Sequence, residues 1–202
     1  MTGLAGILLA AGTGKRFGSQ KLLHPLPDGV PVGVASARAL VQAVPNTLAV
    51  VQPGDRLLIE AFSAIGLRIV ENPLADHGMS TSLAAGVSAA GEASGWLIAL
   101  ADMPWIRPAT IRVLADMLQD GASMVAPIVG GRRGHPVGFS RRWGDKLRTL
   151  GGDDGARGLL AEYADQLILV TTVDAGVLED VDYPDDLVRD VKGVIPGTGK
   201  YA

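Results

Sequence analysis

The chain has 202 residues, of which 48% are apolar and only 4% aromatic, a composition typical of one compact domain without an aromatic binding surface. The 21 acidic residues outnumber the 18 basic ones, and nucleic-acid-binding proteins normally show the opposite balance, so we expect no nucleic acid partner. The chain lacks cysteine, a basic signal-peptide start and any apolar run long enough to span a membrane. We therefore expect a cytoplasmic protein without disulfides, thiolate metal sites or membrane contact.

Short apolar runs alternate with helical patterns over the first 126 residues. The runs at 4–10, 47–51, 67–70, 96–101 and 123–126 predict strands that are buried on both faces, as in parallel sheets. Apolar spacing predicts helices over 31–44, 56–65 and 80–90, and a further helix that begins at Pro108. This alternation indicates right-handed βαβ units, with helices on both faces of a mostly parallel sheet.

The remainder of the chain is less regular. We expect a turn at 130–134, a strand at 135–139 near the edge of the sheet, a helix over 155–163, an extended segment at 167–173 and a short helix from Pro184. No linker separates two cores, so residues 1–192 are expected to form a single domain. Residues 193–202 are rich in glycine and proline and are expected to form a flexible tail.

A glycine-rich segment, residues 9–18, directly follows the first expected strand. Ligands of open α/β sheets bind beyond the carboxyl ends of the strands, so this segment is expected beside the ligand. Gly12 and Gly14 allow close approach of the backbone, and successive N–H groups of such a loop bind phosphate oxygens. Arg16 and Lys21 supply positive charge for a polyanion. The alternative is an ordinary glycine-rich turn with solvated basic side chains.

Two common phosphate-binding motifs do not fit this segment. A Walker A loop needs Gly-Lys followed by Ser or Thr, whereas Gly18 is followed by Ser19, Gln20 and Lys21. The dinucleotide fingerprint needs a glycine where Phe17 stands. Both motifs are therefore excluded.

Carboxylates occur at two places that suit a metal ion. Asp102 directly follows an apolar strand, where an unpaired buried charge would be costly, and Mg²⁺ prefers a few carboxylates together with substrate phosphates. The alternative for Asp102 is a turn or helix-capping residue. Asp180 and Asp182 point to the same side if their segment is extended. Either could complete a metal site with Asp102, or cap the short helix that Pro184 begins.

Several segments together resemble the molybdenum cofactor cytidylyltransferases and the wider superfamily of MobA-like NTP transferases. They follow the family's order along nearly the whole chain: Leu9-Ala-Ala-Gly-x-x-x-Arg-x-Gly-x-x-Lys21, Gly78-Met-Ser-Thr-Ser-Leu83, Ala101-Asp-Met-Pro104, Gly134-His-Pro-Val137, Gly152-Asp-Asp-Gly-Ala-Arg157 and Asp180-Val-Asp-Tyr-Pro-Asp-Asp-Leu187. Tyr183 departs from the pattern, because the family has threonine there.

The resemblance implies a fold and a set of site residues. The fold is a Rossmann-like α/β/α sandwich with a mostly parallel sheet, of the nucleotide-diphospho-sugar transferase type. The implied nucleotide-binding residues are Leu9, Ala10, Ala11, Gly12, Gly14, Lys21, Gly78 and Ser82, with Ser82 at the base. Arg16, Lys21 and Asp102 are the implied catalytic residues; the first two bind the triphosphate, and Asp102 holds Mg²⁺ with Asp180 or Asp182.

The resemblance also implies a reaction and partners. Members with Ala-Ala-Gly resemble cytidylyltransferases and those with Gly-Gly resemble guanylyltransferases, so Ala11 favours CTP over other NTPs. His135 and Arg157 belong to segments similar to those of molybdenum cofactor cytidylyltransferase, which implies that they bind the acceptor. The acceptor is then a phosphorylated small molecule such as molybdopterin, and a molybdoenzyme is a transient partner.

Two other functions are compatible with this pattern. Some relatives of this type are described as nicotine-degradation oxidoreductases, which would use NAD(P)H, although Phe17 breaks the dinucleotide fingerprint. A nucleotide-binding chaperone that delivers a finished cofactor is the second alternative. A pure carrier has no need of a triphosphate–Mg²⁺ site, so Arg16, Lys21 and Asp102 favour an enzyme.

Overall fold

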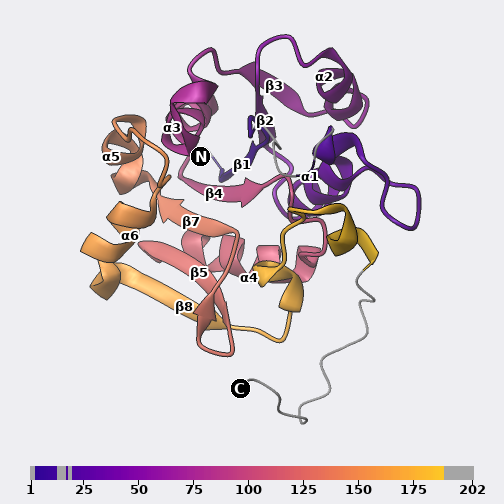
Figure 1. Cartoon of the computed structure of the whole chain (residues 1–202). Coiled ribbons are helices and arrows are strands. Elements are labelled where there is room, and N and C mark those ends of the chain that lie inside the picture. The colour runs from indigo at the N-terminus through magenta and orange to yellow at the C-terminus, as the bar shows by residue number, and fades with distance from the viewer. Residues whose placement is uncertain (1–2, 13–16, 18–19, 189–202) are drawn as a thin grey trace.

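The computed structural model describes residues 3–12, 17 and 20–188. Within them, an eight-stranded sheet crosses the centre of the molecule (Figure 1). Its strands follow the order β3-β2-β1-β4-β7-β5-β6, and β8 pairs with β5. The strands are β1 (Ala5–Leu9), β2 (Thr47–Val51), β3 (Arg68–Glu71), β4 (Gly95–Leu100), β5 (Met124–Val129), β6 (Arg132–Arg133), β7 (Val137–Ser140) and β8 (Leu167–Thr171).

The expected parallel core of the sheet is confirmed. β1 pairs in parallel with β2 and β4, and Leu8 is aligned with Ala49 on one side and Ala99 on the other. Parallel pairing also joins β2 to β3 and β5 to β8. All five residues of β1 and of β2 are buried, which explains why these strands are continuously apolar in sequence.

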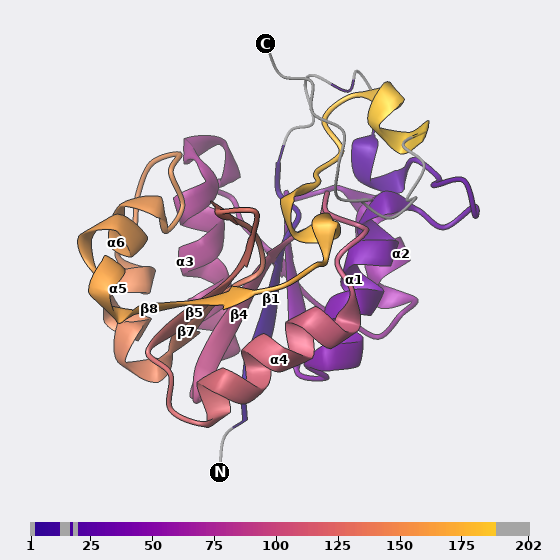
Figure 2. The same cartoon turned by 90° about the horizontal axis from the view of Figure 1, so that it is seen from below.

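Helices cover both faces of the sheet, as Figure 2 shows. Helices α1 (Val32–Ala43), α2 (Arg56–Ser63) and α4 (Pro108–Gln119) enclose one core, which contains Leu40, Phe62 and Leu114. Helices α3 (Met79–Ala90), α5 (Gly144–Arg148) and α6 (Arg157–Glu162) enclose the other. Six short 3₁₀ segments are described: Lys21–Leu23, Ala75–His77, Arg141–Trp143, Ala164–Gln166, Ala175–Leu178 and Pro184–Val188. The α/β/α sandwich expected from the sequence is therefore present.

The position expected for the strand at 135–139 was wrong. β7 lies inside the sheet, between β4 and β5, and is antiparallel to both. Gly138 allows β7 to fit between β4 and β5, because a Cβ atom at this residue would come within 2.6 Å of the Val125 side chain. The local sequence predicts a short apolar strand. It does not reveal that the chain turns back through β6 and inserts this strand between β4 and β5, because that placement depends on distant parts of the chain.

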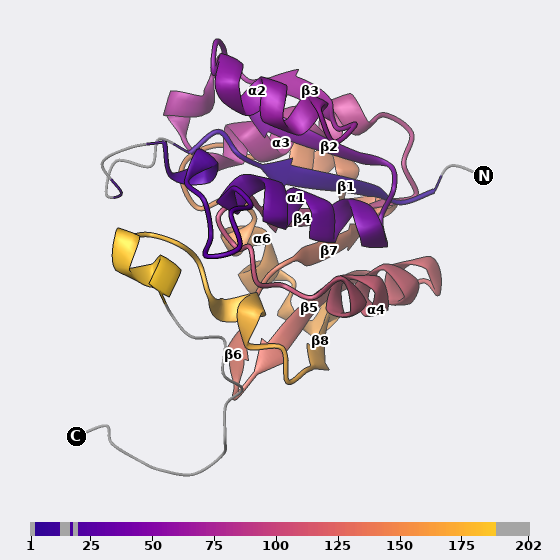
Figure 3. The same ribbon diagram turned by 90° about the vertical axis from the view of Figure 1, so that its right-hand side faces the viewer.

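The last described segment lies on the side of the molecule where β1 ends (Figure 3). The backbone N–H of Val181 donates a hydrogen bond of 2.9 Å to the carbonyl of Asp102. This bond brings the acidic residues of the carboxyl-terminal segment to the end of β4.

Two expectations concern the ends and surroundings of the chain. The tail expected at 193–202 lies outside the described residues, and the single-domain boundary at 192 stays a prediction. No described helix combines the length and the apolar character needed to cross a bilayer.

Candidate active site

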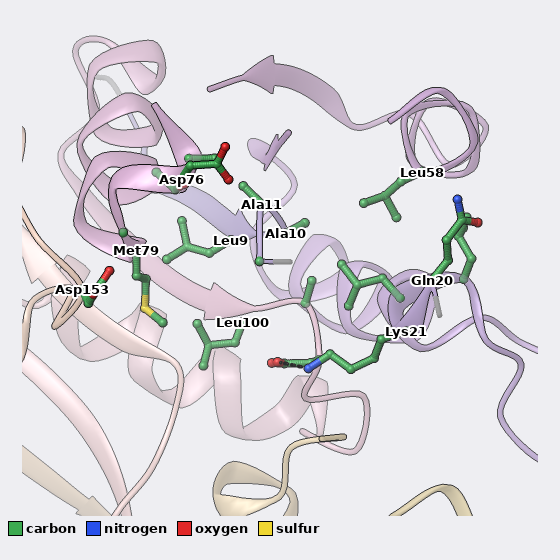
Figure 4. Close-up of a pocket in the computed structure, with 18 residues that line it drawn as sticks. Leu9, Ala10, Ala11, Gln20, Lys21, Leu58, Asp76, Met79, Leu100 and Asp153 are labelled. Atoms are coloured by element: carbon green, nitrogen blue, oxygen red, sulfur yellow. Dashed lines mark hydrogen bonds and ion pairs between the residues drawn. The ribbon is translucent and has the colours of Figure 1, made fainter. Parts of the chain in front are cut away.

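A cavity of about 600 Å³ opens at the carboxyl ends of β1 and β4 (Figure 4). Seven of the predicted nucleotide-binding residues lie in the described part of the chain. All seven line this cavity: Leu9, Ala10, Ala11, Gly12, Lys21, Gly78 and Ser82. Asp102 lines it as well. Gly14 and Arg16 lie outside the described residues, so their predicted roles stay predictions.

Lys21 and Asp102 form an ion pair in the wall of this cavity. Lys21 Nζ lies 2.8 Å from Asp102 Oδ2 and 3.5 Å from Asp182 Oδ1. The lysine side chain is only 11% exposed and that of Asp102 26%, so water screens the pair less than it screens a surface ion pair. A basic and an acidic side chain, 81 positions apart in sequence, thus share one site.

The alternative role of Asp102 as a helix cap is not what the structure shows. The start of α4 is held by Asp174, whose Oδ2 accepts hydrogen bonds from the backbone N–H of Arg107 at 2.9 Å and from Thr110 Oγ1 at 2.6 Å. Asp102 instead turns one carboxylate oxygen to Lys21, and its other oxygen, Oδ1, is buried without a hydrogen-bond partner in the described part of the chain. Such an oxygen is costly to leave unpaired, so it is a candidate ligand atom for a bound cation or water.

Among the described residues at this site, the carboxylates of Asp102, Asp180 and Asp182 accompany the ammonium group of Lys21. Burial raises the pKa of the Asp180 carboxyl above its ordinary value, and the negative charges of Asp102 and Asp182 raise it further. Among the described residues, no three acidic or histidine side chains form a metal site alone. Mg²⁺ commonly takes one or two protein carboxylates and completes its shell with phosphate and water. Asp102 with Asp180 or Asp182 fits that requirement.

The start of α3 contacts the loop that contains Gly152 and Asp153. Gly78 has a φ of +104°, and a Cβ atom there would collide with Asp153 Oδ1 and the Gly152 carbonyl. Ser80 strengthens the contact, because its backbone N–H donates to the Gly152 carbonyl at 3.1 Å. Glycine is therefore required at position 78, and two motifs separated by some 70 residues of sequence meet at the cavity.

A second cavity, of about 460 Å³, lies next to the first. His135 and Arg157, the predicted acceptor-binding residues, both line it together with Arg133. Val137 and Phe139 contribute apolar surface. The structure thus places two arginines, a histidine and apolar side chains around one space.

The two cavities share a boundary. Leu9, Met79, Leu100 and Asp153 line both. Figure 4 shows Lys21 on one side of Leu100, and Met79 and Asp153 on the other. The two cavities are therefore adjacent, with these four side chains at their boundary.

His135 is neutral at physiological pH. Burial lowers the pKa of its imidazole from 6.5 to about 4; the Asp102 carboxylate opposes this shift and the Arg133 guanidinium adds to it. Its Nδ1 is buried and has no hydrogen-bond partner in the described structure. A neutral imidazole with a free ring nitrogen can bind a polar ligand group without contributing charge.

This shift predicts a loss of stability in mild acid. The unfolded chain protonates His135 near pH 6.5 and the folded chain only near pH 4, so the folded state loses stability as the pH falls through that window. Between pH 7 and pH 5 the loss from this residue is about 2 kcal/mol. Urea unfolding of wild type and His135→Gln at both pH values measures it. The exposed His77→Gln variant should keep the wild-type difference, whereas an unchanged difference in His135→Gln would contradict the assignment.

Several cavity residues were missed in the sequence. Asp153 and Asp76 line the first cavity, and Arg133 lines the second. Asp153 belongs to the motif Gly152-Asp-Asp-Gly-Ala-Arg157, so the sequence motif could have identified it as a site residue. Asn72 lines neither cavity but donates a hydrogen bond to Ser82, which lines the first. Asn72 follows β3 at its carboxyl end, where ligand-site residues concentrate in such sheets, and that rule could have identified it.

Known proteins share both the sequence and the fold. The profile of the MobA-like NTP transferase domain matches residues 6–167. The nicotine blue oxidoreductase of Paenarthrobacter nicotinovorans is 30% identical over 195 residues, which cover 92% of this chain and 95% of that protein.

Among the similar solved structures are those of two proteins that match over most of their length. The protein Rv0371c of Mycobacterium tuberculosis H37Rv superposes with a TM-score of 0.80 at 27% identity, covering 92% of this chain and 95% of that one. It has also been crystallised in complex with manganese, and that structure superposes with a TM-score of 0.71. A nucleotidyl transferase of Methanothermobacter superposes with a TM-score of 0.77 at 27% identity, covering 92% and 94% of the two chains.

The profile spans four fifths of the chain, and its matched residues include β1, α3 and the end of β4, which form the first cavity. The chain therefore belongs to the MobA-like NTP transferase family, within the nucleotidyltransferase superfamily.

Proposed function

We propose that the chain is a Mg²⁺-dependent cytidylyltransferase, which transfers CMP from CTP to a phosphorylated small molecule and releases pyrophosphate. The observation that carries the proposal is the ion pair of Lys21 with Asp102, 2.8 Å long, in the wall of a cavity that Gly12 also lines. A triphosphate needs a cation, and a metal ion needs a carboxylate. The described part of this site offers both within one space.

The acceptor binds in the second cavity. Arg133 and Arg157 supply charge for an anionic acceptor, while Val137 and Phe139 supply apolar contact for its body. His135 adds an uncharged hydrogen-bonding group. A pterin that carries a phosphate, as molybdopterin does, has both features, and it is the acceptor that the sequence motifs favour.

The reaction needs positioning more than acid–base catalysis. An oxygen of the acceptor phosphate attacks the α-phosphorus of CTP, a new P–O–P bond forms, and the bond to the β-phosphate oxygen breaks as pyrophosphate leaves. The attacking phosphate is already anionic, so no strong base is required. The protein must bring two anions together in line and offset their charge, which Lys21 does with its ammonium group.

Asp102, together with Asp180 or Asp182, would hold Mg²⁺. The manganese complex of the Mycobacterium tuberculosis relative supports a divalent cation in this family. When bound, the ion neutralises phosphate charge and orients the triphosphate. Asp102 Oδ1 supplies the carboxylate oxygen that the described structure leaves unpaired.

Ala11 is the residue that favours CTP. It is 6% exposed and lines the first cavity, so its methyl group occupies space beside the nucleotide. In Ala11→Gly we expect the ratio of kcat/KM for GTP to kcat/KM for CTP to rise by roughly tenfold, because one methyl group in a pocket changes selectivity by about that factor. Pyrophosphate release with each nucleotide measures the ratio, and an unchanged ratio would remove Ala11 from base selection.

A panel of CTP, GTP, ATP, UTP and NADPH, each with Mg²⁺, tests the donor directly. A ligand that binds only the folded state raises the melting temperature. We expect the largest rise with CTP, followed by pyrophosphate release when molybdopterin is added. Absence of a shift with every nucleoside triphosphate would reject the proposal.

The second candidate is an NAD(P)H-dependent oxidoreductase. It is favoured by the 30% identity to nicotine blue oxidoreductase. The same panel separates the two candidates, because this reading predicts a shift with NADPH and oxidation of NADPH by a quinonoid dye. Phe17, where the dinucleotide fingerprint has glycine, favours the transferase.

A further inference from the structure

We propose that Asn72 is a positioning residue that fixes the hydroxyl group of Ser82 as a hydrogen-bond donor to the nucleobase in the first cavity. This inference rests on the proposed function, since it requires a nucleotide there. Asn72 lies in the loop after β3, and Ser82 lies in the first turns of α3. Both are buried, at 3% and 4% exposure, and Ser82 lines the cavity.

The orientation of the Asn72 amide follows from its neighbours. The backbone N–H of Leu74 can only donate, and it lies 3.0 Å from Asn72 Oδ1. The oxygen is therefore on that side, and the amide nitrogen faces α3. Asn72 Nδ2 then donates one hydrogen to Ser82 Oγ and the other to Thr81 Oγ1, both at 3.0 Å.

This arrangement decides which way each hydroxyl hydrogen points. The Thr81 hydroxyl lies 2.8 Å from the carbonyl of Leu74 and 2.9 Å from that of Gly78, so its hydrogen is used within the protein. Ser82 Oγ accepts from Asn72, and no acceptor for its own hydrogen is present in the described part of the chain. The Ser82 hydrogen is thus available to a ligand.

A ligand group that binds the Ser82 hydrogen is a hydrogen-bond acceptor. The carbonyl of Ala11, which also lines the cavity, already accepts a hydrogen bond from Gln52 Nε2 at 3.0 Å. A base edge that presents a carbonyl oxygen or an unprotonated ring nitrogen can use the Ser82 hydrogen, and one that presents only N–H groups cannot. Cytosine offers both acceptors, O2 and N3, next to each other.

Asn72→Asp tests this arrangement with little change of shape. The carboxylate still accepts from Leu74, but it cannot donate, so the Ser82 hydroxyl turns its hydrogen toward residue 72 and away from the cavity. Titration calorimetry with CTP and Mg²⁺ should show affinity lowered by about tenfold, the effect of one lost hydrogen bond, while kcat at saturating CTP stays within about threefold of wild type. Ser82→Ala should lower affinity by a similar factor.

Two further variants separate positioning from general damage. Thr81→Val removes the other partner of the same amide and should leave CTP affinity unchanged. In the double variant Asn72→Asp with Ser82→Ala, affinity should be no lower than in Ser82→Ala alone, because both changes remove one interaction. Additive losses would mean that the new charge or a distorted loop is responsible, and would overturn the inference; so would a loss in Thr81→Val equal to that in Asn72→Asp.

Melting temperatures establish that the variants are folded. If Asn72→Asp does not fold, the variants Ser82→Ala and Thr81→Val still test the inference. Lower CTP affinity in Ser82→Ala with unchanged affinity in Thr81→Val supports it. Wild-type CTP affinity in Ser82→Ala overturns it. Wild type that binds none of the four nucleoside triphosphates overturns the proposed function as well. Wild type that binds CTP while Ser82→Ala is unaffected overturns the inference alone.

Discussion

Asp102→Asn is expected to lower Mg²⁺-dependent pyrophosphate release by about 10²–10³-fold, the loss that follows removal of a group that stabilises transition-state charge. The substitution preserves size but removes the charge opposite Lys21 and one oxygen available to the metal. Manganese binding, measured by electron paramagnetic resonance without nucleotide, should weaken in parallel. Steady-state release assays over a Mg²⁺ series measure the first effect.

The matched control is Asp116→Asn, which removes an exposed carboxylate from α4. Asp116→Asn should melt near the wild-type temperature, because its carboxylate is exposed. Asp102→Asn loses its ion pair with Lys21 and is expected to melt at a lower temperature but to remain folded at the temperature of the assay. Undiminished pyrophosphate release by Asp102→Asn would take Asp102 out of the metal site and leave Asp180 and Asp182 as the remaining candidates.

Lys21→Met is expected to lower kcat/KM for the nucleotide by at least about 10²-fold, because a buried ammonium group beside the phosphates acts with little screening. Methionine keeps an apolar stem of similar length and so preserves packing. The variant should remain folded under the assay conditions, so the loss in kcat/KM cannot be attributed to a smaller fraction of folded enzyme. Initial-rate kinetics together with urea unfolding separate the two.

Lys146→Met serves as the control, because Lys146 is an exposed lysine on α5 and lines neither of the two cavities. It should retain wild-type kinetics. A folded Lys21→Met enzyme with full activity would show that the ion pair with Asp102 is structural only, and the proposed triphosphate site would have to be abandoned.

The layered architecture and most of the first cavity were predictable from local sequence. The buried strands β1, β2 and β4 are continuous apolar runs, and such runs are required wherever helices cover both faces of a parallel sheet. Because parallel strands end at the same edge, the residues that follow β1 and those that follow β4 were expected to lie close together, and Gly12 and Asp102 do line the same cavity.

The relations between distant segments were not predictable in this way. β7 enters the sheet between β4 and β5, which an isolated apolar run does not reveal. The capping of α4 by Asp174 links residues more than 60 positions apart, and it frees Asp102 for the cavity. The structure brings Asp180 near Asp102 and Lys21, and it brings Asp182 near Lys21, although these residues are about 80 or more positions apart in the sequence from Asp102 or Lys21.

The sequence by itself determined the kind of fold, the family and the chemical types of group at the site, because apolar periodicity and short motifs are local properties. Only the tertiary structure decided which polar atoms face one another, as Lys21 with Asp102 and Asn72 with Ser82, and how far burial lowers the pKa of His135. The physical reason is that hydrogen-bond direction and desolvation depend on every neighbour within a few ångströms, and most of those neighbours come from distant parts of the chain.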